Sequence, residues 1–268
     1  MKKRLQKLCV AAVLVACLST FGAWTNAPQE QEIRYGDFDL LSTYATETVA
    51  YTYKDDSVQN ATDGNVPRYM AVDGLTDACG AVAGAIAVGY YDKYAPNLIE
   101  GWTSHYSTGR YRTQDTTYVP AVIHELYTKM GTASGGVTEN GFLNGLRQYA
   151  AERDYTATFT KVGTSSSLDF AACKTAIDNN KIIALLADAG NVYSVAFDTN
   201  KDYVETMNIP SPHIMIAYGY MQVKYYNVHG LFRTDTYLRA FVTNQTQKTL
   251  YYKVTPHNLT SAYVMDIG

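Results

Sequence analysis

Thr76-Asp77-Ala78-Cys79-Gly80-Ala81-Val82-Ala83-Gly84-Ala85 opens a run of small and apolar residues that continues to Tyr91. We expect a helix over residues 78–93, and its many small residues indicate a central, buried position where neighbouring elements approach closely. Cys79 would stand at the N-terminus of this helix, where the dipole and the free N–H groups favour thiolate over thiol. A small, inert core residue is the alternative interpretation of this cysteine.

Further helices are predicted downstream of this stretch. Apolar residues recur at helical spacing within residues 119–130 and again within residues 139–152. Residues 167–169 are expected to cap another helix, which ends at Asn179 and carries Cys173 among apolar neighbours. We therefore interpret Cys173 as a core residue.

From residue 181 the pattern changes to short runs rich in Tyr, Val and Ile, which are typical of strands. The expected strands are 181–187, 193–197, 213–220, 222–228, 236–243 and 250–254. The pair His229-Gly230 is expected at a hairpin tip. Helices followed by a sheet predict an α+β fold, with a helical N-terminal half and an antiparallel β C-terminal half.

Residues 1–27 have the pattern of a secretory signal peptide, with a basic start and then an apolar run. Leu14-Val15-Ala16-Cys17 also resembles the lipobox of bacterial lipoproteins, in which Cys17 would be acylated and kept as a membrane anchor. Both interpretations predict an exported protein that is secreted or held at the cell surface. No later segment is long and apolar enough to predict a membrane span.

The remaining chain divides into two predicted parts. Residues 28–65 are expected to form an N-terminal arm packed on the domain, or a short pro-segment. Within them, residues 47–53 alternate like a strand, and residues 55–67 are rich in turn formers and predict a loop. One compact domain is expected over residues 66–268.

Charge and cysteine content narrow the classes of function. Residues 1–27 hold four basic residues and no acidic one, so their removal changes the formal net charge from −3 to −7. An exported acidic protein is not expected to bind nucleic acid. Only Cys79 and Cys173 lie beyond the signal, so a disulfide scaffold is not expected, although one bridge between them would exclude a catalytic Cys79. No histidine pair has metal-ligand spacing, and no cofactor is expected.

A cysteine becomes a candidate nucleophile when a histidine and an orienting Asn or Asp occur far downstream. His213 begins an expected strand 134 residues after Cys79. Asn244 follows the end of a later strand and is the first candidate for the orienting residue. Asn227 and Asp235 are its rivals.

Two motifs resemble the papain-like cysteine peptidases, in particular the bacterial branch similar to bacteriocin-processing, double-glycine peptidases. They are Ala78-Cys79-Gly80 at a helix start and His213 followed at the sixth position by Gly219-Tyr220. The similarity covers roughly residues 66–244. It implies a helical half with Cys79, a β half with His213 and a peptide or protein substrate in the cleft between them.

The resemblance also implies the chemistry, a Cys-His-Asn triad that forms a thioester acyl-enzyme without metal or organic cofactor. Family members usually place a Gln shortly before the cysteine, where it completes the oxyanion hole with the cysteine's own N–H. Asp73 stands there instead, and an ionised carboxylate would repel an oxyanion, so Asp73 serves only if it is protonated or turned away. The expected function is an exported cysteine peptidase. The alternatives are a catalytically inactive binding or surface protein of the same fold and a transglutaminase-like acyltransferase.

Overall fold

The computed structural model describes residues 34–35, 44–48, 52–60, 66–101, 118–197, 202–227, 230–243 and 249–268. Residues from Ile33 to Gly268 form one compact unit, which is the unit considered below. The predicted signal peptide and lipobox, with Cys17, lie outside the described residues. The described part is an α+β fold, as the order of helical and strand patterns predicted.

The described elements follow one another along the chain with strands both before and after the helices. The helices are α2 (Cys79–Tyr91), α3 (Val119–Lys129), α4 (Glu139–Ala151) and α5 (Phe170–Asp178). The strands are β1 (Arg34–Tyr35), β2 (Tyr44–Thr48), β3 (Thr52–Asn60), β4 (Val137–Thr138), β5 (Ala157–Thr164), β6 (Ile182–Ala187), β7 (Gly190–Phe197), β8 (Asp202–Ile209), β9 (His213–Asn227), β10 (Gly230–Phe241), β11 (Thr249–Lys253) and β12 (Leu259–Ile267).

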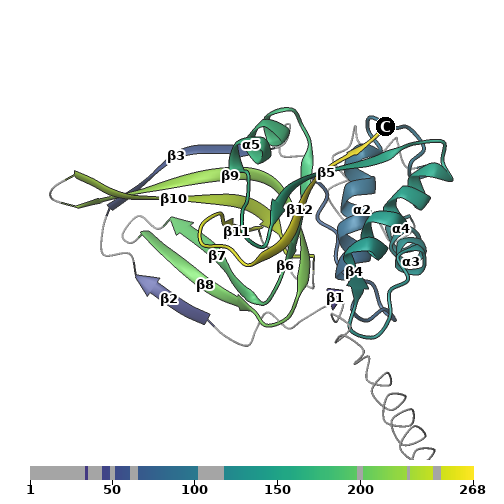
Figure 1. The fold of residues 1–268 in the computed structure, drawn as a ribbon, viewed down its shortest axis with the longest axis horizontal. Helices are drawn as coiled ribbons and strands as arrows, with labels where there is room; N and C mark the ends of the chain where they lie inside the picture. Colours follow the sequence, from purple (N-terminus) through teal and green to yellow (C-terminus); the bar gives the residue numbers. More distant parts are fainter. Residues whose placement is uncertain are drawn as a thin grey trace, which may run out of the picture. The chain divides into compact units, whose positions relative to one another are not determined.

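The helices α2, α3 and α4 lie to one side of the sheet in Figure 1, with α2 nearest the sheet and in contact with β9. Every residue of α2 is buried, as its small-residue composition predicted. A Cβ atom on Gly84 would lie 2.7 Å from Met130 Cε and 3.2 Å from Leu126 Cδ1. The missing side chain therefore allows α3 to pack directly against the backbone of α2.

The strands of the main sheet are antiparallel and, among the described residues, number ten. Their order is β2-β8-β7-β11-β10-β9-β6-β12-β5, with β3 also paired to β9. β9 is the organising strand because it pairs with β10 along one edge and with β6 and then β3 along the other. β9 and β10 form a hairpin in which Asn227 pairs with Gly230, so the two expected strands 213–220 and 222–228 are one.

The sheet separates two apolar cores, and alternation along β9 assigns its side chains to them. Ile214, Ile216 and Tyr218 join the inter-layer core, which the sheet shares with α2, α3 and α4. Met215 and Ala217 join the α5-side core, which also contains apolar residues of α5. The start of β9 is thus held from both faces.

The expected loop over residues 55–67 is wrong in its first part, because β3 continues to Asn60. β3 pairs with β9 through backbone hydrogen bonds, with a register shift between Asp55 and Ser57, and such pairing overrides local turn preference. The longer strands β5, β8 and β12 and the two-residue strands β1 and β4 were not predicted. β12 shows only imperfect alternation of buried residues. In the arm, β2 pairs with β8, and β1 pairs with β4.

Helix α4 approaches the end of α3 at Gly145, where a Cβ atom would lie 2.9 Å from Met130 N and 3.0 Å from Met130 Cα. Because backbone atoms cannot move aside cheaply, Gly145→Ala should lower the free energy of unfolding by about 1–3 kcal/mol. Urea denaturation followed by circular dichroism measures this. Asn144→Ala, on the exposed face of the same helix, is the control and should change it by less than about 0.5 kcal/mol. Equal stability of the two variants would contradict this packing.

Candidate functional site

Cys79 is the first residue of α2, and its side chain is fully buried. The N-cap residue, Ala78, supplies no side-chain oxygen to the first turn. The N–H groups of a helical first turn have no acceptor within the helix, and they carry the positive end of the dipole. The helix start favours negative charge on the Cys79 sulfur, whereas burial of the side chain opposes it.

His213 is the first residue of β9, where it pairs with Ala187 of β6, and it is fully buried. The residues that follow Cys79 and His213 lie against each other. A Cβ atom on Gly80 would clash with Val137 Cγ1 and lie 3.6 Å from Ile214 Cδ1. The glycine after the cysteine therefore brings the N-terminus of α2 against the start of β9.

Thr243 is a polar partner of His213 that the sequence pattern did not predict. Its hydroxyl donates a hydrogen bond to the carbonyl of Ile214 and lies 3.3 Å from His213 Nε2. Thr243 lies two residues after the end of β10. The predicted orienting residue, Asn244, is the next in the chain and lies outside the described residues. The expected end of strand 236–243 was the available signal, since it placed this part of the chain near the histidine.

The two rivals of Asn244 lie far from the start of β9. Asp235 pairs with Val223, which is ten residues along β9 from His213, or about 30 Å at the rise of an extended strand. Its carboxylate contacts Lys253 Nζ at 3.0 Å and Arg233 Nε at 3.3 Å. Asn227 lies still further along β9, at the hairpin end. The structure does not bring either residue to His213.

Asp73 lies in an exposed turn with Gly74, closed by a contact of 3.4 Å from Leu75 N to Val72 O. A second carboxylate, that of Asp77, lies closer to Cys79 in sequence and accepts a hydrogen bond from Gly135 N at 2.9 Å. Asp77 therefore ties the segment before α2 to the turn before β4. The backbone N–H of Cys79 remains the first candidate donor to an oxyanion.

Cys79 and Cys173 are both free thiols. They form no disulfide bridge that would exclude a reactive Cys79. Cys173 lies in α5 and in the α5-side core, whereas Cys79 belongs to the inter-layer core. Burial, followed by the negative charge of Asp169, raises the pKa of the Cys173 thiol to about 12. Cys173 is the inert core cysteine that its apolar neighbours predicted.

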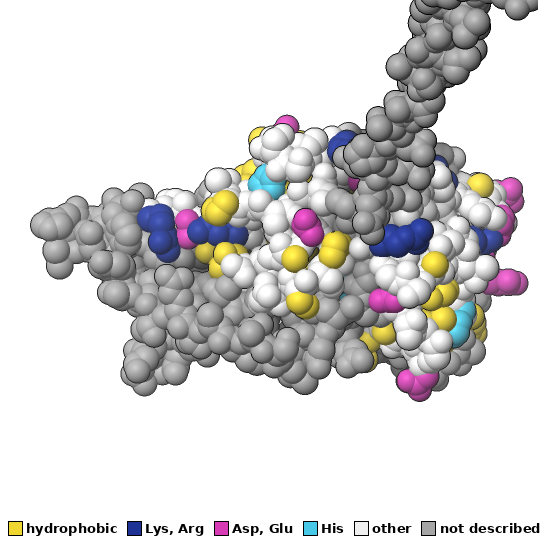
Figure 2. Space-filling model, turned by 60° about the horizontal axis from the view of Figure 1, so that its bottom comes forward, with side chains coloured by type: hydrophobic (Ala, Val, Ile, Leu, Met, Phe, Trp, Pro, Cys, Tyr) yellow, Lys and Arg dark blue, Asp and Glu magenta, His cyan; other side chains and the backbone are white. Residues whose placement is uncertain are grey.

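Within the described ranges, no group of three or more His, Cys, Asp or Glu side chains is arranged to hold a metal ion. A helix long and apolar enough to cross a membrane is likewise not found in the described part of the chain. On the face drawn in Figure 2, described Lys and Arg side chains are interspersed with Asp and Glu. That face carries no continuous basic stripe among its described residues, of the kind that binds nucleic acid.

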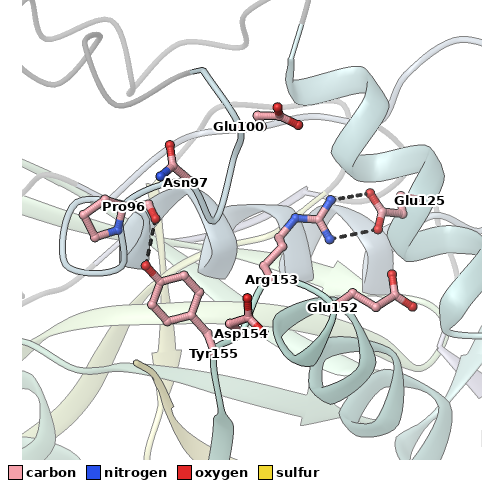
Figure 3. A pocket seen from close by; sticks show the side chains of 8 residues that line it. All are labelled: Pro96, Asn97, Glu100, Glu125, Glu152, Arg153, Asp154 and Tyr155. Atoms are coloured by element: carbon pink, nitrogen blue, oxygen red, sulfur yellow. Dashed lines mark hydrogen bonds and ion pairs between the residues drawn. The ribbon is translucent and has the colours of Figure 1, made fainter.

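A hollow of about 820 Å³ lies near the C-terminal end of α2, at the opposite end of this helix from Cys79 (Figure 3). Pro96 and Asn97, which line it, follow the C-terminus of α2, about 18 Å along the helix from Cys79. Arg153 forms a two-pronged ion pair with Glu125 across its wall, at 2.8 and 3.0 Å. Tyr155 donates to the carbonyl of Pro96 at 2.7 Å. These contacts hold α3, α4 and the loop after α2 together.

No protein-family model, curated protein or solved structure matches this chain. Its function is therefore argued from its own residues. The arrangement that can do chemistry is a thiol at a helix start beside a strand that begins with a histidine.

Alkylation should distinguish the two thiols. At pH 8, iodoacetamide should modify Cys79 at least about 100-fold faster than Cys173, because thiolate is the reacting form and the raised pKa keeps Cys173 protonated. Peptide mapping by mass spectrometry gives both rates in one sample. Cys173→Ala should leave the rate at Cys79 unchanged. Equal rates, or no modification of Cys79 in the folded protein, would contradict the assignment.

Proposed function

We propose that the chain is an exported cysteine peptidase with a papain-like arrangement, in which Cys79 is the nucleophile and His213 the general acid and base. The substrate is a peptide or protein, and the reaction needs no cofactor. The observation that carries the proposal is the packing of Gly80 against Ile214, which draws together the elements that begin with Cys79 and His213.

The proposed reaction has two halves. In acylation, the Cys79 thiol proton passes to the imidazole of His213, and the thiolate attacks the substrate carbonyl carbon. The C–N bond then breaks, the proton moves from the imidazolium to the leaving amine, and a thioester remains. In deacylation, His213 takes a proton from water and the hydroxide attacks the thioester carbonyl carbon. The C–S bond then breaks to release the carboxylic acid, and the proton returns from the imidazolium to the Cys79 sulfur.

The electrostatics of the helix start support this assignment. The dipole of α2 favours the thiolate, and the backbone N–H of Cys79, in the first turn, is the proposed donor to the oxyanion of the tetrahedral intermediate. The second oxyanion donor is not assigned, because Asp73 is exposed and its carboxylate, when ionised, accepts hydrogen bonds but cannot donate one.

Two observations favour a second candidate, a non-catalytic binding or surface protein of the same fold. The side chains of Cys79 and His213 are both fully buried, whereas a substrate must reach a working nucleophile. Alternation along β9 also puts the Cβ of His213 on the side of Met215, opposite to Ile214. A transglutaminase-like enzyme, which uses the same residues, remains the acyl-transfer variant of the first candidate.

Hydrolysis of a broad peptide library separates these candidates. The wild-type chain should cleave peptides, and Cys79→Ala should abolish cleavage because no thioester can form, whereas Cys173→Ala should retain it. Products are identified by mass spectrometry, with and without an added primary amine. Cleavage by Cys79→Ala would contradict the proposal. No cleavage by a chain whose Cys79 alkylates rapidly would favour the binding protein, and transfer to the amine in preference to water would favour the transglutaminase-like enzyme.

A further inference from the structure

The contacts of Thr243 specify more about His213 than the packing of Gly80 against Ile214 does. The Thr243 side chain is 2 % exposed, so its hydroxyl has little access to water. Within the described part of the chain, its polar contacts go to consecutive residues of β9, namely the carbonyl oxygen of Ile214 and Nε2 of His213 at 3.3 Å. A single hydroxyl thus joins the end of β10 to the backbone and the imidazole at the start of β9.

Counting protons fixes the direction of both hydrogen bonds. A hydroxyl has one proton, and a carbonyl oxygen can only accept, so the Thr243 proton lies toward Ile214 O. The hydroxyl oxygen then has only lone pairs to offer to His213, and Nε2 must be the donor. A neutral imidazole protonated on Nε2 has its basic lone pair on Nδ1.

We infer that Thr243 is the positioning residue that holds His213 as its Nε2–H tautomer. The consequence of this inference rests on the proposed function: Nδ1 is then the nitrogen that exchanges a proton with the Cys79 sulfur. In the proposed reaction Thr243 contacts the ring nitrogen that does not exchange the proton, so it acts through the ring that it orients.

The same contacts suit both protonation states that the reaction needs. When Nδ1 takes the thiol proton, Nε2 still carries its own proton and still donates to Thr243. The hydrogen bond becomes charge-assisted at that moment and is stronger than its neutral form. The Thr243 hydroxyl proton stays directed at Ile214 O throughout, so neither side chain has to reorient during a turnover.

Nitrogen-15 NMR of the imidazole rings in the full chain tests the inference directly. The two ring nitrogens of a neutral histidine differ in chemical shift according to which one is protonated, and His213→Gln identifies the signals of His213 among the five histidines. The wild-type chain should show protonated Nε2 and unprotonated Nδ1. An Nδ1–H tautomer, or a mixture of the two, in the wild type would overturn the inference whether or not the chain cleaves peptides.

Substitutions at Thr243 test the consequence. Thr243→Val removes the hydroxyl and should give mixed tautomers and lower kcat about 10- to 100-fold, with KM changed less than about threefold. Thr243→Ser keeps the hydroxyl and should retain the tautomer and most of kcat. A single Nε2–H tautomer in folded Thr243→Val would contradict the inference. If Thr243→Val does not fold, the wild-type and Thr243→Ser spectra decide the matter alone.

These readouts separate the inference from the proposed function. A pure Nε2–H tautomer in a chain that cleaves no peptide would keep the positioning role and reject the peptidase. Cleavage with the other tautomer would keep the peptidase and reject the role of Thr243.

Discussion

The close approach of α2 to the start of β9 is the contact on which the rest of this structure depends. It is possible because residue 80 is a glycine, so that the side chains of Val137 and Ile214 fill the space beside the helix backbone. Gly84 makes the corresponding contact with α3 further along α2. A helix with bulkier residues at these positions would hold the layers apart, and Cys79 and the β9 strand would no longer share a core.

The helices could be predicted from the sequence, because the residue pattern that indicates each helix lies within one short segment of the chain. The small-residue run of α2, the apolar stripes of α3 and α4 and the cap at Asp169 each lie within one element, and each helix appears within two residues of its expected ends. The β half was less predictable, because strands are stabilised by partners that are distant in the chain. β3 is the clearest example, since its turn-forming residues are held extended by pairing with β9.

The candidate site likewise has features that the sequence predicted and features that it did not. Cys79 at a helix start and His213 at a strand start are positions that the sequence pattern indicates and the structure contains. The role of Thr243 was not predictable, because it depends on which of two successive residues faces the histidine at the end of β10. The burial of Cys79 and His213 was not predictable either, and it now matters most, since both of the proposed reacting groups are enclosed. Turnover requires a movement that uncovers them, which the binding-protein alternative does not.

The distance between Cys79 Sγ and His213 Nδ1 in a crystal structure of the protein tests the central claim most directly. The account predicts a separation within about 4 Å, with Nδ1 as the nearer ring nitrogen, because a proton must pass between these atoms. A ring directed to the α5-side core, with Nδ1 beyond direct or water-mediated reach of the sulfur, would contradict it.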